Sequence, residues 1–302
     1  MAKLIQWFPG HMKKAMRDME EKRALCDGVI CVLDSRAPIA TYNPKLPEIF
    51  AGKPVLYVLN KSDLSDGKSE KFAAMIEAQG KPCVAISAVN GASRRVLEKR
   101  LQILTKEKRE RAESKGVTRR FRYTVVGIPN TGKSTVVNLL GGAKRAKTGD
   151  IAGVTRDVRW IKCAAFDLLD TPRTMPPSCK TQYLARHLAY IGSLNDDILD
   201  IADVALELLK ELKANYPAAL QERYGIDCGG NNAETDKTAD EEERTREAVE
   251  MLETACRRRG FILRGGEFDY ERGARAVIDD FRKGRLGKIC LENPSDFADV
   301  KF

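Results

Sequence analysis

The stretch "GIPNTGKST" at residues 127–135 decides the fold. It sets Gly127, Gly132, Lys133 and Ser134 at the spacing of a phosphate-binding loop, after the run "FRYTVV" and before the apolar run "STVVNLL". A loop between a strand and a helix turns backbone N–H groups toward a phosphate, because the N-terminus of a helix favours negative charge. Lys133 is expected to neutralise phosphate oxygens, and the Ser134 hydroxyl is expected to bind Mg²⁺. The alternative is a glycine-rich turn without a ligand.

Short apolar runs that end in polar or glycine-rich clusters recur through the first half of the chain. They cover residues 28–36, 54–63, 82–88, 121–130 and 166–172. Such runs predict buried strands of a parallel sheet, and the helical patterns at 70–78 and 93–104 predict an α/β, doubly wound, mostly parallel architecture. Ligands of open α/β sheets bind at the carboxyl ends of the strands, so we expect the motifs at these strand ends to share one site.

A second motif, "LNKSD" at residues 59–63, precedes the phosphate loop. A carboxylate at Asp63 can accept both the N1–H and the N2–H of guanine, and adenine offers neither donor in that register. We expect Asn60 to brace the neighbouring loops, the Lys61 stem to lie over the base, and the pair Ser87–Ala88 to give a backbone N–H to guanine O6. The predicted nucleotide-binding residues are Asn60, Lys61, Asp63, Ser87, Ala88, Asn130, Thr131, Gly132, Lys133, Ser134 and Thr135.

The remaining elements of such a site follow the phosphate loop. Asp170 in "LLDTP" is predicted to hold Mg²⁺ together with Ser134, and Thr155 in "GDIAGVTRD" is the candidate threonine that closes over Mg²⁺ and the γ-phosphate. A threonine in a loop is usually only a loop residue, so its assignment depends on its position between the two motifs. Along the chain, the two base-binding motifs (60–63 and 87–88) come first, then the phosphate loop (127–135), the threonine that closes over the γ-phosphate (Thr155) and the metal-binding Asp170. This order of motifs is permuted. It predicts a circularly permuted guanine-nucleotide fold, which is reasonable because the termini of a domain often lie close together.

The charge of the chain is unevenly distributed. Residues 1–195 carry 35 Lys/Arg against 18 Asp/Glu, residues 196–302 carry 17 against 25, and the whole chain has a net charge of +9. A basic part of this size favours a polyanionic partner, nucleic acid before membrane, and the alternative is a solvated charged face. The eight cysteines form no CxxC pair, and no apolar run approaches the ~20 residues that span a bilayer. We therefore expect a cytoplasmic protein with reduced thiols and no membrane partner.

Three helical patterns without intervening strands fill most of the last third of the chain. Residues 196–217 have apolar side chains at helical spacing, residues 240–260 begin acidic and end in three arginines and a glycine, and residues 269–288 form a third pattern. They predict a small all-helical domain. The expected domains are residues 1–190, with the sheet and an N-terminal helix, and residues 191–302.

Two further segments carry weaker patterns. Residues 11–25 read as an amphipathic helix. Residues 105–122, with eight basic and three acidic side chains and no apolar periodicity, read as an exposed connector, with an RNA-facing strip as the alternative.

Together these motifs resemble the bacterial ribosome-biogenesis GTPase A family (RbgA/YlqF), circularly permuted GTPases that help mature the large ribosomal subunit. The resemblance runs nearly end to end. It is carried by "WFPGHMKKA" (7–15), "LDSRAP" (33–38), "NKSD" (60–63), "ISAVNG" (86–91), "GIPNTGKST" (127–135), "LLDTP" (168–172) and "RGGEFDYERGARAVIDDFRKGRLGKICLE" (264–292).

The resemblance implies a circularly permuted P-loop GTPase domain followed by a helical domain that docks on rRNA of the large subunit. It implies a GTP-hydrolysing assembly factor for a late step of large-subunit maturation, which uses GTP/GDP and Mg²⁺ and acts as a monomer. It also implies that His11 assists hydrolysis, although a histidine at a helix start more often caps or packs, and that Asn130 ligates K⁺. The basic region 257–288 is the expected rRNA contact.

The sequence departs from the family at one position. The family reads Asp-x-x-Gly, and here Arg173 stands in place of the glycine that binds the γ-phosphate and lets the following segment move. The change leaves two readings open, weakened sensing of the nucleotide state or a cation near the γ-phosphate. An alternative function is therefore a guanine-nucleotide-binding RNA scaffold with little hydrolysis, and a weaker one is a GTPase that acts on another RNA such as tRNA.

Overall fold

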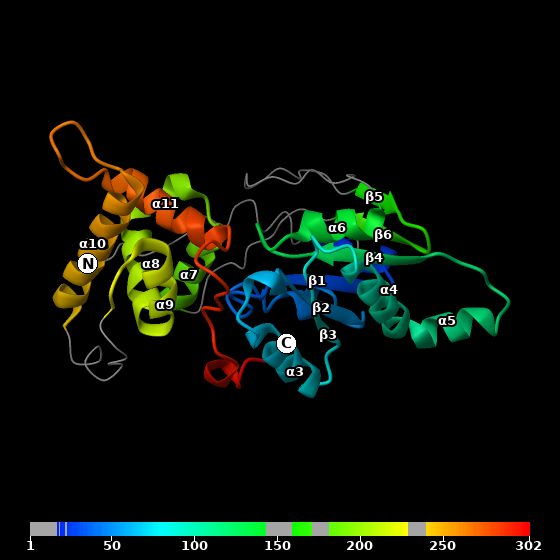
Figure 1. Cartoon of the computed structure of the whole chain (residues 1–302). Coiled ribbons are helices and arrows are strands. Elements are labelled where there is room, and N and C mark those ends of the chain that lie inside the picture. Colours follow the sequence, from blue (N-terminus) through cyan, green and yellow to red (C-terminus); the bar gives the residue numbers. More distant parts are fainter. Residues whose placement is uncertain (1–16, 18, 22, 143–158, 171–180, 229–239) are drawn as a thin grey trace. The chain divides into compact units, whose positions relative to one another are not determined.

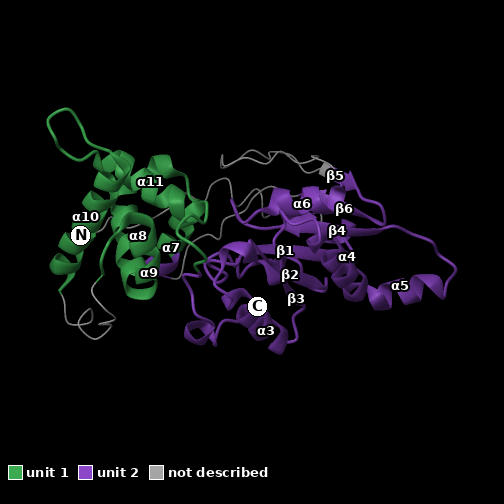
Figure 2. Ribbon diagram, in the orientation of Figure 1, with its two compact units in different colours: residues 1–5, 185–289 green, residues 6–184, 290–302 purple. Residues whose placement is uncertain are grey.

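The computed structural model describes residues 17, 19–21, 23–142, 159–170, 181–228 and 240–302. The chain divides into two compact units (Figure 2). The sheet unit comprises residues 6–184 and 290–302, and the helical unit comprises residues 1–5 and 185–289. None of the described helices is both long and apolar enough to cross a membrane.

The sheet unit is built on six strands in the order β3-β2-β1-β4-β6-β5. The strands are β1 (Gly28–Asp34), β2 (Val55–Asn60), β3 (Cys83–Ala85), β4 (Phe121–Val126), β5 (Arg159–Lys162) and β6 (Phe166–Asp170), labelled in Figure 1. Five of them are parallel, and β5 pairs antiparallel with β6 at the edge. The predicted α/β, mostly parallel fold is confirmed. All five predicted strands are present.

The order of the strands explains the order of the motifs. β4, which leads into the phosphate loop, pairs on one side with β1 and on the other with β6. The two strands that carry the base motifs, β2 and β3, lie beyond β1 although they precede β4 in the chain. The sheet therefore brings the early and late motifs to one edge, as a circular permutation requires.

The first three strands, β1 to β3, are mostly apolar and buried, as expected of strands inside a parallel sheet. The helices of the sheet unit are α2 (Leu46–Ile49), α3 (Lys68–Ala78), α4 (Ser93–Leu104), α5 (Lys106–Glu113) and α6 (Lys133–Gly141), with the first residues of α7 (Gln182–Tyr190). The helix α4 packs against β2 and α6, and α6 packs against β4 and β6. The main core lies beneath these two helices and includes Ile30, Leu56, Leu97 and Val136.

The C-terminal segment, residues 290–302, packs on the sheet unit and not on the helices that precede it. The centroid of the Phe302 ring lies 4.5 Å from that of Tyr42, in a tilted pair, and 5.5 Å from that of Tyr57, edge to face. The side chain of Gln79 exchanges hydrogen bonds with the backbone of Val300 (2.8 Å) and Phe302 (3.0 Å). We expected domains of residues 1–190 and 191–302; the two compact units divide after residues 184 and 289, and these contacts hold residues 290–302 in the sheet unit.

The helical unit contains α8 (Ile201–Asn215), α9 (Pro217–Tyr224), α10 (Glu241–Arg259) and α11 (Tyr270–Arg282), together with most of α7. Aspartates begin three of these helices: Asp200, Asp240 and Asp269 each accept backbone N–H groups of the first turn. The helix α10 ends at Gly260 in the left-handed conformation (φ 69°), as its sequence predicts. The helix α11 packs against both α8 and α10.

Three details differ from the sequence predictions. The segment 105–122 is exposed for most of its length, as expected, although Thr105 and Phe121 are buried. Its first part forms the helix α5, which has no buried residue and carries i,i+4 ion pairs such as Lys106–Glu110. The helix predicted from residue 196 begins only at Ile201, because Asp200 caps it. The edge strand β5 was not predicted, because Arg159 and Lys162 leave only two apolar residues between them and no longer apolar run. Of the predicted helix 11–25, most residues lie outside the described part of the chain.

Candidate functional site

The phosphate loop connects β4 to α6 through two left-handed residues. Asn130 has φ 61° and Gly132 has φ 87°, and Gly132 caps the N-terminus of α6. The buried Thr131 hydroxyl donates to the carbonyl of Ile128 (3.0 Å), which fixes the turn from within. The N-terminus of a helix favours negative charge, so the start of α6 turns an anion-attracting end toward this loop.

Lys133 and Asp170 meet at the carboxyl edge of the sheet, from the start of α6 and the end of β6. The Lys133 ammonium forms an ion pair with the Asp170 carboxylate, and both residues are almost fully buried. The Ser134 hydroxyl is also buried and has no hydrogen-bond partner among the residues that the structure describes. A hydroxyl oxygen and a carboxylate oxygen are hard oxygen ligands of the kind that Mg²⁺ prefers.

Asn60, at the end of β2, joins three loops through one amide group. Its Nδ2 donates to the carbonyl of Thr131 in the phosphate loop (2.9 Å). Its Oδ1 accepts the backbone N–H of Ala88, in the loop after β3 (3.0 Å). The amide is buried, so both of its polar atoms depend on these partners. The early motif and the phosphate loop therefore lie side by side, as the bracing role predicted for Asn60 requires.

Lys61 follows in a left-handed conformation (φ 63°) that turns its side chain toward the phosphate loop. Its ammonium donates to the carbonyl of Asn130 (2.5 Å) and lies 2.9 Å from a carboxylate oxygen of Asp34. Arg36 binds the same carboxylate through Nε (3.0 Å) and Nη2 (2.9 Å). Asp34 thus joins the end of β1 to the base motif.

Asp34 and Arg36 form a buried charged pair that the site prediction did not include. Asp34 is fully buried and Arg36 is nearly so. Burial alone would raise the pKa of the Asp34 carboxyl, but Arg36 and Lys61 outweigh it and hold that pKa well below its ordinary value. The signal was present in "LDSRAP", where an aspartate and an arginine follow a buried strand at the same sheet edge as the other motifs.

The remaining predicted residues lie in the same loops. Asp63 sits in the short helix Ser62–Leu64, is exposed, and makes no hydrogen bond or ion pair with any described residue. Ser87 is half-buried, and its carbonyl accepts the hydroxyl of Ser93 (2.8 Å). Thr135 is half-buried in the first turn of α6. The predicted residues His11 and Thr155, and the departure at Arg173, lie outside the described residues.

Comparison with known proteins gives one family and several close relatives. The sequence profile of a family described as "50S ribosome-binding GTPase" matches residues 122–226. A protein named Ribosome biogenesis GTPase A from Bacillus cereus is 36% identical over 299 residues, which cover 98% of this chain and 96% of that protein. A Thermotoga maritima protein of the same name is 28% identical over 302 residues, covering 98% and 97% of the two chains.

Solved structures agree with these sequence matches. The crystal structure of GNP-bound YlqF from T. maritima superposes with a TM-score of 0.62 at 26% identity, covering 93% of this chain and 98% of that one. A GDP-bound YlqF structure gives a TM-score of 0.64 at 24% identity, covering 93% of this chain and all of that one. Both structures therefore share the fold of this chain over nearly its whole length.

Proposed function

Because the chain belongs to the ribosome biogenesis GTPase A family, and is therefore a GTP-hydrolysing enzyme of ribosome assembly, we propose that it acts at a late step of large-subunit maturation. In this proposal the sheet unit binds GTP or GDP at the carboxyl edge of its strands. The helical unit binds rRNA of the large subunit, and the nucleotide state controls that binding.

The observation that carries this proposal is the pair of hydrogen bonds made by Asn60. They join the phosphate loop at Thr131 and the loop after β3 at Ala88, so one nucleotide can reach both. Asp63, which has no described partner, would accept the N1–H and N2–H of guanine. The backbone N–H of Ser87 would lie toward O6, since that of Ala88 already donates to Asn60. A base without those donors would leave the carboxylate unpaired, which disfavours ATP.

The residues around the phosphates fit Mg²⁺ and a polyphosphate. We propose that Ser134 and Asp170 hold the ion, with Thr155 as the third protein group, and that Lys133 neutralises phosphate oxygens. Bound there, Mg²⁺ would offset the negative charge that develops on the β- and γ-phosphates. His11 is the proposed assistant of hydrolysis, and the side chain of Asn130 is the proposed ligand for K⁺.

The proposed rRNA contact lies in the helical unit, in the basic region 257–288. Within the last third of the chain, residues 256–288 carry ten Lys/Arg against five Asp/Glu, whereas residues 196–255 carry six against seventeen. A localised positive patch of this kind attracts phosphates of RNA. We also propose that the protein acts as a monomer in the cytoplasm.

The central test is GTP turnover by the full chain with and without purified large ribosomal subunits, in K⁺ and then in Na⁺. We expect slow turnover alone and an increase of at least tenfold with large subunits, because a ribosomal partner can order the groups around the γ-phosphate. K⁺ should support a faster rate than Na⁺. Small subunits and the variant Lys133→Ala serve as controls.

An unchanged rate in the presence of large subunits would contradict the proposed partner. Equal rates in K⁺ and Na⁺ would contradict only the role of Asn130. Co-sedimentation across ribosomal fractions separates this function from action on tRNA, since a tRNA-directed enzyme would not follow the large-subunit fraction.

A second candidate function follows from Arg173, which replaces the glycine of the Asp-x-x-Gly motif. If that arginine weakens hydrolysis, the protein would serve mainly as a guanine-nucleotide-binding RNA scaffold. The variant Arg173→Gly separates the two: a large gain in turnover supports the scaffold, and no gain in an already active protein removes it.

A further inference from the structure

The carboxyl ends of α9 and α10 and the segment after α11 surround a pocket of about 600 Å³ in the helical unit. Its charged lining consists of Arg223, Arg258, Arg259 and Arg285, with a single glutamate, Glu222. Helix carboxyl ends carry partial negative charge and favour cations, which accounts for arginines gathering here. We call this cavity the arginine pocket.

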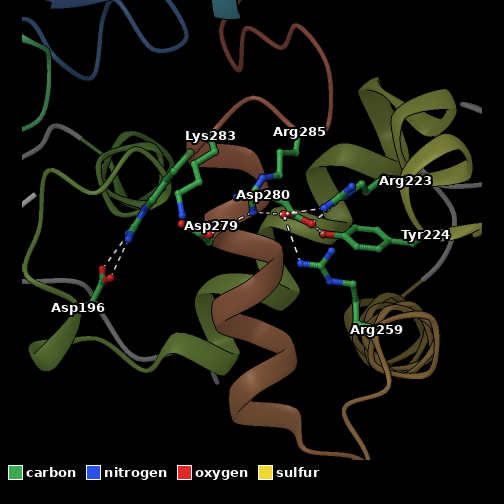
Figure 3. Close-up of polar contacts among 9 residues, drawn as sticks. Asp196, Arg223, Tyr224, Arg259, Asp279, Asp280, Lys283 and Arg285 are labelled. Carbon is green, nitrogen blue, oxygen red and sulfur yellow. Dashed lines mark hydrogen bonds and ion pairs between the residues drawn. The ribbon is translucent and has the colours of Figure 1, made fainter.

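A buried carboxylate beneath the pocket fixes two of these arginines. Asp280 on α11 is fully buried. It accepts hydrogen bonds from Arg223 Nε (2.8 Å) and Nη2 (3.1 Å), from Arg285 Nη1 (2.9 Å) and from the Tyr224 hydroxyl (2.9 Å), as Figure 3 shows. Burial tends to raise the pKa of Asp280, but these hydrogen bonds lower it below its ordinary value. The carboxylate therefore stays ionised and orients the guanidinium groups.

The carboxylates at the pocket, Asp280, Glu222 and Asp279 (3.4 Å from Arg285 Nη1), carry less charge than its four arginines. The nearest approach of Arg259 to Asp280 is 3.8 Å, between Nη2 and Oδ1, and the oxygens of Asp280 already accept four hydrogen bonds from other groups. Arg258 is exposed and makes no hydrogen bond or ion pair with any residue that the structure describes. The wall at Gly287 is open, because a Cβ built there would meet no atom within 4 Å. The pocket thus keeps an accessible surplus of guanidinium groups.

We propose that the arginine pocket binds a phosphodiester group of RNA. Guanidinium groups bind phosphate oxygens with two parallel hydrogen bonds, and prior orientation by Asp280 reduces the entropy lost on binding. RNA is favoured over an acidic peptide because the family profile that matches residues 122–226 is described as ribosome-binding, and the surrounding region 256–288 carries ten Lys/Arg against five Asp/Glu. The inference rests on the proposed rRNA-binding function and gives it a specific site.

The test measures binding of the full chain to deproteinised large-subunit RNA by filter binding, at several salt concentrations and with a non-hydrolysable GTP analogue present. The variant Arg258→Ala removes a side chain that bonds to no described residue, so it should leave folding intact. We expect it to weaken binding roughly tenfold and to make the dependence of log K on log salt shallower by about one. Arg258→Glu should weaken binding further.

The matched control is Arg275→Ala, which removes the same charge from α11 in the same unit. Arg275 lies outside the pocket and pairs with Glu271 at 3.0 Å on the helix surface. It should change affinity and salt slope much less than Arg258→Ala. Thermal unfolding and GDP affinity should match the wild type in all three variants, which separates loss of binding from loss of folding.

The outcomes distinguish the pocket from the wider function. Wild-type protein that binds neither the RNA nor large subunits would contradict the proposed function itself. Wild-type binding that survives Arg258→Glu, or that Arg275→Ala weakens equally, would overturn the pocket alone. Competition by polyglutamate as effective as that by RNA would also overturn it, because the site would then recognise acidic protein.

Discussion

Two side chains, Asn60 and Asp34, hold together the loops that surround the candidate nucleotide site. Asn60 bonds to the phosphate loop and to the loop after β3. Asp34 fixes Lys61, whose ammonium also binds the carbonyl of Asn130. The Arg36 guanidinium forms a second ion pair with the same Asp34 carboxylate. A small number of buried polar groups thus sets where the base motif lies relative to the phosphate loop.

Substitution of Asp34 should affect both folding and nucleotide binding. Asp34→Asn leaves Arg36 and Lys61 without their carboxylate, and loss of one partner from a buried ion pair costs about 3 kcal/mol. GDP affinity should also fall, because Lys61 loses the group that orients it. Urea unfolding and GDP titration measure the two effects. Asp66→Asn is the control, since Asp66 pairs with Lys68 in a partly exposed position.

The same pair predicts how stability depends on pH. The pKa of Asp34 is lowered in the folded protein, so its contribution is fully present above the ordinary aspartate pKa of about 4 and is lost as pH falls toward the lower folded value. The difference in unfolding free energy between wild type and Asp34→Asn should therefore shrink between pH 6 and pH 3. A constant difference across that range would mean that Asp34 is not held ionised by its neighbours.

At the scale of elements, Gly132 lets the phosphate loop and the start of α6 lie against Asn60 at the end of β2. Gly132 has φ 87°, and a Cβ built on it would overlap the side-chain amide of Asn60. The close approach of the loop to Asn60 is therefore possible only for glycine at this position. The edge of the sheet and the start of the helix are coupled through this one contact.

The variant Gly132→Ala should abolish nucleotide binding, and Gly142→Ala at the other end of α6 is its control. Both glycines have positive φ, 87° and 72°, so both substitutions carry similar backbone strain of about 1 kcal/mol. A Cβ at Gly142 meets only the end of the flexible Arg94 side chain. Calorimetric titration with GDP should show loss of binding for Gly132→Ala alone. Equal losses would show that backbone strain, and not the Asn60 contact, matters.

At the scale of the whole molecule, the helical unit is inserted within the sheet unit. The chain leaves the sheet unit after residue 184 and returns at residue 290. Within the sheet unit, the Tyr183 hydroxyl donates to the carbonyl of Leu291 (3.0 Å), which joins the two crossing points. The buried Glu292 carboxylate accepts the N–H groups of Ile39 (2.6 Å) and Ala40 (3.0 Å), next to the "LDSRAP" loop.

The C-terminal segment should therefore stabilise a sheet to which it contributes no strand. Phe302→Ala removes a buried ring from the cluster with Tyr42 and Tyr57 and should lower the free energy of unfolding of the sheet unit by roughly 3 kcal/mol. Lys301→Ala, at the exposed neighbouring position, should change it by less than about 0.5 kcal/mol. Scanning calorimetry of the two variants measures both effects, and equal unfolding temperatures would contradict this role of the tail.

The sequence by itself determined the strands, the phosphate loop, the base motif and the permuted order, because each depends on local spacing and on apolar runs. It also determined the two ends of α10, where acidic residues begin the helix and Gly260 ends it, because local chemistry decides both. It did not identify α5 or β5, because a charged surface helix and a four-residue edge strand lack an apolar pattern.

Only the tertiary structure decided which distant groups meet. The bond from Asn60 to Thr131 and the pairing of Asp34 with Lys61 join residues from different strand ends. The four hydrogen bonds that converge on Asp280 and the return of residues 290–302 to the sheet unit are also products of packing. The physical reason is common to all: buried polar groups must find partners, and no spacing along the chain specifies which partner the fold will supply.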